Sequence, residues 1–205
     1  MTKQLITLEI YMFKKIAITT VFTSAILLAE SGVGININEE DLELEGVIDS
    51  RNLAALQTSS TIFQSDLNFL NINSDRKLFG AGFGATNKLE AVPGVELTFG
   101  AKYVWAEVGD ESVNALPLMA KIRYDFPPLM FNIPPVAVEA KTLYAPSALS
   151  FGDSERYSEF RLSADIEMIE NVKIYAGYRN IHAEYKDIEN DLFDNSFYGG
   201  LRITY

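Results

Sequence analysis

Apolar and polar residues alternate with a period of two along most of the chain after residue 31. The clearest stretch begins at Glu159: Phe160 and every second residue up to Met168 are apolar, while the residues between them are polar. Successive side chains of a β-strand point to opposite faces, so this pattern predicts a strand with one apolar and one polar face. The same rule predicts strands in five further segments: 95–105, 116–126, 136–144, 172–179 and 197–205.

Three earlier segments follow the rule less strictly: 42–49, 63–69 and 79–85. With the six segments above they make nine strands, whereas single-chain bacterial membrane barrels have even strand numbers. A short additional strand from Val33 to Ile37 raises the total to ten. Treating the N-terminal segments as an extension of the rim lowers it to eight. We predict ten strands, with eight as the alternative.

The connections between the segments have the composition of turns between antiparallel neighbours. Glu170-Asn171 suits a tight periplasmic turn, and the acidic run from Asp187 to Asn195 reads as a longer loop outside the cell. Pro117 has no backbone N–H to donate, so its strand is expected to begin after it or to bulge there. The alternation also breaks between Tyr178 and Ile181, which indicates a bulge or an exit from the bilayer.

The first 31 residues have the features of a secretory signal. Lys14 and Lys15 precede an apolar stretch from Ile16 to Leu28, and Ala29 and Ser31 are the small residues of a cleavage site. The apolar stretch is shorter than the ~20 residues that a spanning helix needs. We therefore predict a signal peptide at 1–31, with Met12 as the hypothesised translation start, and a single domain at 32–205.

Alternation alone also fits a soluble β-sandwich or a lipocalin, whose apolar face points inward. Three features favour a membrane barrel: the export signal, charged residues deep within the polar faces, and aromatic residues near strand ends. The aromatic residues are Trp105, Tyr124, Phe126, Tyr144 and Tyr205, which match the girdles expected at a membrane interface. The predicted fold class is all-β, a transmembrane antiparallel up-and-down barrel.

The last strand carries a second signal of location. Phe197, Leu201, Ile203 and Tyr205 alternate with other residues, and the chain ends on the aromatic ring. This resembles the terminal strand by which outer-membrane barrels are handed to their assembly machinery. We expect the outer membrane of a Gram-negative envelope as the location, with its lipid and the assembly machinery as partners; a stable protein partner is not identified.

Composition excludes several other functions. The chain has no Cys and a formal net charge of -11, so thiol chemistry is excluded and nucleic acid is an unsuitable partner. We expect no cofactor and no metal site.

Four segments carry recognisable motifs: Tyr144 to Phe151, Tyr157-Ser158-Glu159, Tyr175 to Ile181 and Phe197 to Gly200. They resemble segments of the YfaZ family of outer-membrane proteins, among them its Tyr-x-Pro-x-x-Leu-Ser and Gly-Tyr-Arg segments. The resemblance is strongest from about Leu97 to Tyr205. It implies an outer-membrane barrel of porin-like type, and none of its motifs is catalytic.

The polar faces supply candidate residues for the lumen. They are Glu96, Lys102, Lys121, Arg123, Glu139, Lys141, Glu159, Arg161, Asp165, Arg179 and Arg202. Opposed acids and bases can pair and fill a small barrel, or they can line a narrow porin-like channel for small solutes. The strand with Gly80, Gly82 and Gly84 is where we expect space for water.

Two rival functions remain. A lipid-modifying enzyme at the rim would use His182, the single His, with Ser150 or Ser154 as nucleophile, but the spacing defines no triad. A surface-interaction barrel would use the acidic loop with Asp187, Glu189, Asp191 and Asp194, which lacks the Gly and terminal Glu of an EF-hand loop. We predict that the protein is not an enzyme.

Overall fold

The computed structural model describes residues 32–38, 40–50, 61–72, 76–108, 111–127, 134–185 and 192–204. The predicted signal peptide at 1–31 lies outside these ranges. Within them, no helix is long and apolar enough to cross a membrane.

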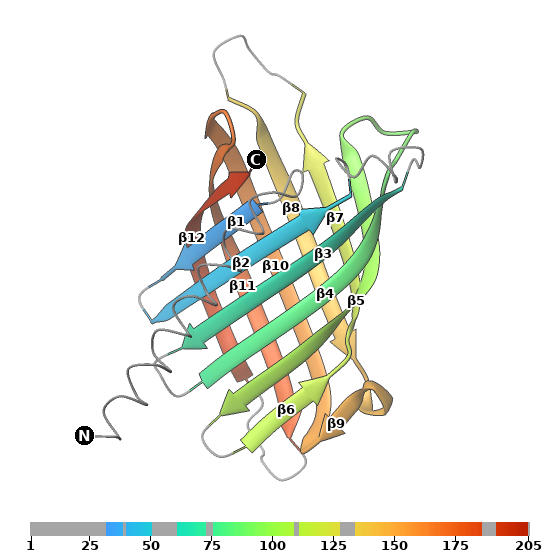
Figure 1. The fold of residues 1–205 in the computed structure, drawn as a ribbon, viewed down its shortest axis with the longest axis vertical. Helices are drawn as coiled ribbons and strands as arrows, with labels where there is room; N and C mark the ends of the chain where they lie inside the picture. Colours follow the sequence, from blue (N-terminus) through green and yellow to red (C-terminus); the bar gives the residue numbers. More distant parts are fainter. Residues whose placement is uncertain are drawn as a thin grey trace, which may run out of the picture.

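The chain forms one antiparallel sheet that closes on itself (Figure 1). Strands that follow one another in the sequence pair antiparallel, including β4 with β5, and pairing of the first strand β1 with the last strand β12 closes the ring. Its elements are β1 (Gly32–Ile37), β2 (Asp41–Asp49), β3 (Ile62–Ile72), β4 (Arg76–Lys88), β5 (Val95–Val108), β6 (Glu111–Ala115), β7 (Leu118–Asp125), β8 (Val136–Ala145), the 3-10 turn η1 (Ser147–Leu149), β9 (Ser150–Gly152), β10 (Ser154–Ile169), β11 (Val172–Tyr185) and β12 (Leu192–Thr204).

Pro117 interrupts one long strand and does not separate two. Ala115 of β6 lies opposite Val104 and Leu118 of β7 lies opposite Ala101, so the register against β5 is the same on both sides of the proline. The Pro117 carbonyl accepts a hydrogen bond from the Lys102 N–H at 2.9 Å, which keeps the ladder joined. The strand resumes directly after Pro117, as predicted.

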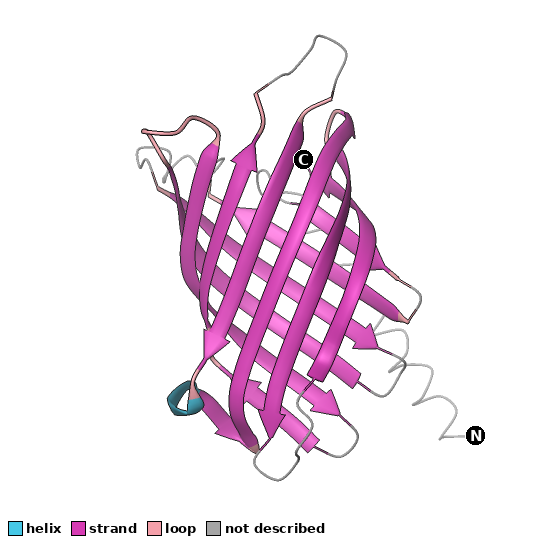
Figure 2. Cartoon of the chain, turned by 180° about the vertical axis from the view of Figure 1, so that it is seen from behind, coloured by secondary structure: helices cyan, strands magenta, loops and turns pink. Residues whose placement is uncertain are grey.

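A similar interruption joins β8 to β9. Pro146 and η1 insert a short turn, after which β9 pairs with β6. Figure 2 shows this turn in cyan at one end of the barrel. Counting β6 with β7 and β8 with β9, the twelve labelled strands make a ring of ten, which confirms the preferred strand number.

The two ends of the barrel are distinguished by the chain ends. Gly32 of β1 lies opposite Thr204 of β12, and we call the end with these residues the proximal end. The other end, with the β5–β6 turn and β9, is the distal end (Figure 1).

Apolar side chains on the outward faces are exposed along the proximal and middle parts of the barrel. Phe99, Leu118, Phe160 and Leu201 are examples, and all of them belong to the predicted apolar faces. Tyr124 and Phe126 pack edge to face near the proximal end, with ring centroids 4.7 Å apart. This outward apolar band is what a barrel in lipid requires.

At the distal end the polarity of the two faces reverses. Buried apolar residues fill the interior there: Leu70, Ile72, Leu78, Val104, Ala106, Val113, Ala115, Met119, Leu143, Ala145, Tyr157, Ile181, Ala183 and Phe193. The outward positions at the same level include polar residues, for example Arg156, which donates to Glu184 at 3.0 Å, and the exposed Lys77, beside exposed aromatic residues such as Phe79 and Phe151. At its outermost level this end therefore has an apolar interior and a polar outer face.

The reversal explains the break in alternation between Tyr178 and Ile181. Tyr178 faces outward, whereas Ile181 is fully buried in the distal core, and the pairing of β11 with β12 shifts directly after Ile181. The break is thus both a bulge and a change of environment. The distal part of the interior is apolar, a feature that the charged lumen candidates from the sequence did not indicate.

Two smaller expectations are also corrected. Residues 192–195 belong to β12 and not to a loop, because Asp194 and Asn195 pair with Ile181 and Asn180 of β11. Gly80, Gly82 and Gly84 leave no space for water, since neighbouring side chains occupy the room beside them. A Cβ at Gly84 would lie 2.9 Å from the Met119 methyl carbon.

The glycine pair at the end of the chain provides a test of interior packing. A Cβ at Gly200 would lie 2.5 Å from the Ile35 carbonyl and 2.6 Å from the Tyr175 ring, whereas a Cβ at Gly199 would meet its nearest atom at 3.9 Å. We expect Gly200→Ala to destabilise the barrel by about 1–3 kcal/mol, the usual range for overpacking. Gly199→Ala should leave stability unchanged. Urea unfolding of the refolded barrels measures both, and equal midpoints would contradict the packing argument.

Candidate functional site

The carboxylate of Glu43 is the centre of the charged part of the lumen. The residue is fully buried on β2. Its two oxygens accept hydrogen bonds from Arg161 Nη1 and Nη2 at 2.9 and 2.8 Å, and from Arg179 Nη1 at 2.8 Å. Asn36 and Asn68 add two further donors at 2.9 and 2.8 Å. A buried charge is tolerated only with such pairing, and here five strands contribute to it.

The two arginines extend this cluster across the barrel. Arg179, 1% exposed, also binds Asp41 at 2.8 Å and Asp194 at 2.5 Å. Arg161 also binds Glu45 at 3.1 Å and forms an ion pair with Glu159. We call Glu43, Arg161, Arg179 and these four acids the ion cluster.

The segments that resemble the YfaZ family build this cluster and the apolar core below it. Tyr157 is fully buried and donates to Glu159 at 2.6 Å, and Arg179 ends the Gly-Tyr-Arg segment. Gly177 leaves room for the ring of Tyr198, which a Cβ would approach to 2.7 Å. Leu149, in the Tyr-x-Pro-x-x-Leu-Ser segment, packs against the apolar core. These motifs therefore fill the lumen.

Basic residues form a continuous row across four adjacent strands. Lys121 of β7 lies directly opposite Lys141 of β8. Lys141 in turn lies opposite Arg161 of β10, and Arg161 lies opposite Arg179 of β11. Like charges directly opposite each other destabilise a sheet. The row is offset by the acids of β2 and β3 on the facing wall of the barrel.

A cavity of about 240 Å³ lies on the proximal side of the ion cluster. Residues from the proximal ends of the strands line its mouth, among them Gly32, Asp49, Glu96, Asp125 and Thr204. Only Met119 of the apolar core reaches its wall. The cavity is therefore open proximally and closed distally, and we call it the vestibule.

The vestibule collects most of the residues predicted to line the lumen. All eleven candidates except Glu159 and Arg179 line it, and those two lie deeper, in the ion cluster. Of the predicted assembly signal, Phe197, Leu201 and Ile203 are exposed on the outer face. Tyr205 lies outside the described residues.

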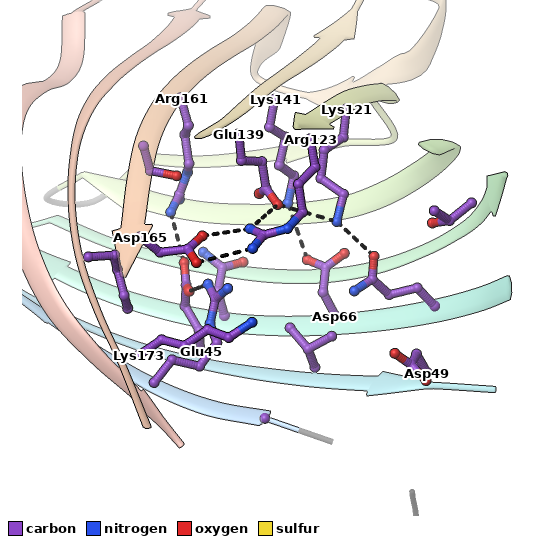
Figure 3. A pocket seen from close by; sticks show the side chains of 18 of the residues that line it. Glu45, Asp49, Asp66, Lys121, Arg123, Glu139, Lys141, Arg161, Asp165 and Lys173 are labelled. Atoms are coloured by element: carbon purple, nitrogen blue, oxygen red, sulfur yellow. Dashed lines mark hydrogen bonds and ion pairs between the residues drawn. The ribbon is translucent and has the colours of Figure 1, made fainter. Parts of the chain in front are cut away.

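Ion pairs line the vestibule and join strands that are not direct neighbours (Figure 3). Lys102 binds Asp66 at 2.6 Å, and Arg123 binds Asp165 in a two-pronged contact at 2.6 and 3.0 Å. Lys121 and Lys141 are held more loosely. Lys121 donates to the neutral Gln64 at 2.9 Å and lies 3.7 Å from Glu139, while Lys141 lies 3.6 Å from Asp66.

The acids that complete both sites were not among the candidates taken from the sequence. They are Asp41, Glu43, Glu45, Asp66 and Asp194. Glu43, Glu45 and Asp66 lie on the polar faces of the less regular early strands, so the same alternation rule was the signal available for them. Asp194 had been assigned to a loop.

The structure does not bring the candidate catalytic residues together. His182 lies opposite Ser158 on the partly exposed face of β11, Ser154 is buried, and the Ser150 hydroxyl donates to the Pro146 carbonyl at 3.2 Å. Of the acidic loop, Asp194 pairs with Arg179, and residues 187–191 lie outside the described residues. Within the described ranges no cluster of three His, Cys, Asp or Glu side chains is arranged to hold a metal ion.

A family model described as YfaZ precursor matches residues 14–205. A search of the curated proteins found no match. Similar solved structures include the NanC porin, 9% identical over 85% of this chain and 98% of that chain, with a TM-score of 0.42. A bacterial polysaccharide outer membrane secretin is 8% identical over 85% and 69% of the two chains, with a TM-score of 0.41. With TM-scores below 0.5, these likenesses carry no argument.

The ion cluster predicts a large effect of one substitution. Arg179→Gln leaves the buried carboxylates of Asp41, Glu43 and Asp194 without their shared cation, and breaking a buried pair in this way costs about 3–5 kcal/mol. Lys173→Gln is the matched control, because Lys173 lines the vestibule and has no ion pair within the described part of the chain. Urea unfolding should show a lower midpoint for Arg179→Gln alone. Equal midpoints would mean that the cluster does not stabilise the fold.

Proposed function

Since the chain belongs to the YfaZ family and forms an outer-membrane-type β-barrel, we propose that it serves the outer membrane as a barrel closed to the passage of solutes. One observation carries this proposal. Two successive layers fill the lumen, the ion cluster and the distal apolar core. A path through the barrel would have to displace both.

The apolar layer is the stronger barrier to ions. Leu70, Leu78, Val104 and Ile181 have no measurable exposure, and moving an ion through such a core requires full desolvation. The ion cluster differs, because its arginines and acids could exchange partners. A narrow porin-like channel therefore requires a change in the distal core and not only in the ion pairs.

We also propose that the proximal end faces the periplasm. Both chain ends of the barrel are there, and the last strand resembles the signal read by the periplasmic assembly machinery. The polar outward face at the distal end suits a rim that projects into water outside the cell. Export is supported by the description of the family as a precursor.

No catalytic role is part of this proposal. His182 is partly exposed whereas Ser154 is buried, and the two residues are not paired across β10 and β11. The motifs that resemble the family are used in packing. Asp194, the described acid of the predicted acidic loop, belongs to β12 and is engaged in the ion cluster.

Planar-bilayer recordings test the closure. Refolded barrel lacking residues 1–31 should give no conductance steps above baseline in KCl, although heat-dependent mobility on a gel shows that it is folded. Discrete, stable steps from the unsubstituted chain would contradict the proposal.

Thiol labelling tests the orientation, because the chain contains no Cys. Ser163→Cys places a thiol in the vestibule, and Lys77→Cys places one on the outer surface at the distal end. A maleimide too large to cross the outer membrane should label Lys77→Cys in intact cells. It should label Ser163→Cys only after the outer membrane is permeabilised. The reverse order would invert the proposed orientation.

A further inference from the structure

The cations at the floor of the vestibule are unequally paired. Lys102 is matched by Asp66 at 2.6 Å, and Arg123 is matched by Asp165 at 2.6 Å and by Asp125 at 3.0 Å. Lys121 and Lys141 are left with Glu139 and with a second, longer contact to Asp66. Glu139 is itself shared with Arg123, 3.9 Å away. Four cations therefore face four carboxylates, but the close contacts go to Lys102 and Arg123, and Lys121 and Lys141 have only the longer ones.

The two loosely held lysines are neighbours. Lys121 and Lys141 lie directly opposite each other on β7 and β8, a position in which like charges repel. Their closest carboxylate oxygens are 3.7 and 3.6 Å away, whereas a charge-assisted hydrogen bond is about 2.7–2.9 Å long. Each ammonium group thus retains capacity to donate to another acceptor.

Both ammonium groups reach the vestibule. Lys121 and Lys141 line it, and their side chains are each 16% exposed. Figure 3 shows them beside Arg123, Glu139 and Asp66. A low-dielectric wall strengthens any interaction with a charge that enters from the mouth.

We propose that the vestibule floor binds a small oxyanion of the phosphate class between Lys121 and Lys141. Such an anion offers several acceptor oxygens to both ammonium groups and offsets their mutual repulsion. The size of the cavity, about 240 Å³, suits one such group and is below the ~300–1,000 Å³ typical of pockets for larger ligands. The acids at the mouth are Asp49, Glu96 and Asp125. They slow the entry of anions by repulsion, but they do not occupy the binding position between the two lysines.

This inference is independent of whether the lumen conducts. It requires only the vestibule and its floor, so conductance tests the closure and anion binding tests the site. A barrel that conducts and binds phosphate would refute the proposed closure alone.

Isothermal titration of the refolded barrel with inorganic phosphate tests the site. The unsubstituted protein should bind phosphate saturably, and affinity should fall with added KCl because the site is partly open to solvent. Lys121→Gln and Lys141→Gln should each weaken binding by about tenfold or more, as loss of one charged donor does. Lys77→Gln removes the same charge from the outer surface and should bind as the unsubstituted protein does.

Two further variants keep the outcome decisive. Lys121→Arg preserves the charge and should retain binding, which covers the case in which Lys121→Gln does not fold. Glycerol 3-phosphate, titrated in parallel, separates a free-phosphate site from one for a phosphate headgroup, since both present the same oxyanion. Absence of heat with both compounds, or equal affinity in the Lys121→Gln/Lys141→Gln double variant, would overturn the proposal.

Discussion

The burial of Glu43 between two arginines is the constraint on which the rest of the lumen depends. A carboxylate removed from water is stable only if all its acceptor capacity is used. Glu43 meets this requirement with Arg161 and Arg179 from one wall and with Asn36 and Asn68 from its own. The contacts join β1, β2 and β3 to β10 and β11, so the interaction that satisfies the charge also holds the two walls of the barrel together.

Two environments divide the barrel along its axis. In lipid the outer face must be apolar, and the interior is then free to hold charges. Towards the distal end the outer face carries polar residues such as Arg156 and Glu184, and the interior becomes apolar, as at Tyr157 and Ala183. The vestibule is the remaining space on the other side of the ion cluster. Its blind shape follows from the order of these layers, because the closed layers lie in the middle and at the distal end.

Strand positions could be predicted from the sequence because a period of two is a local property. In the segment from Glu159 to Met168, the alternation alone assigns each residue to the outward or the inward face, and no knowledge of the neighbouring strands is needed. The prediction failed where a neighbour decides the outcome. Asp194 and Asn195 continue an acidic run and read as part of a loop, but Arg179 draws Asp194 into the ion cluster and β11 supplies the pairing. The glycines at 80, 82 and 84 suggested space, which the side chains of other strands occupy.

The sequence by itself indicated the family and the alternating faces, since each depends on the order of residues along the chain, and it favoured ten strands over eight. It also identified most of the cations and acids that line the vestibule. Only the tertiary structure decided which charges are paired and which are left with capacity to bind. The register between strands sets Lys121 opposite Lys141 and Arg161 opposite Arg179. Closure of the ring then brings Glu43 to the arginines, across a separation of more than a hundred residues in the chain.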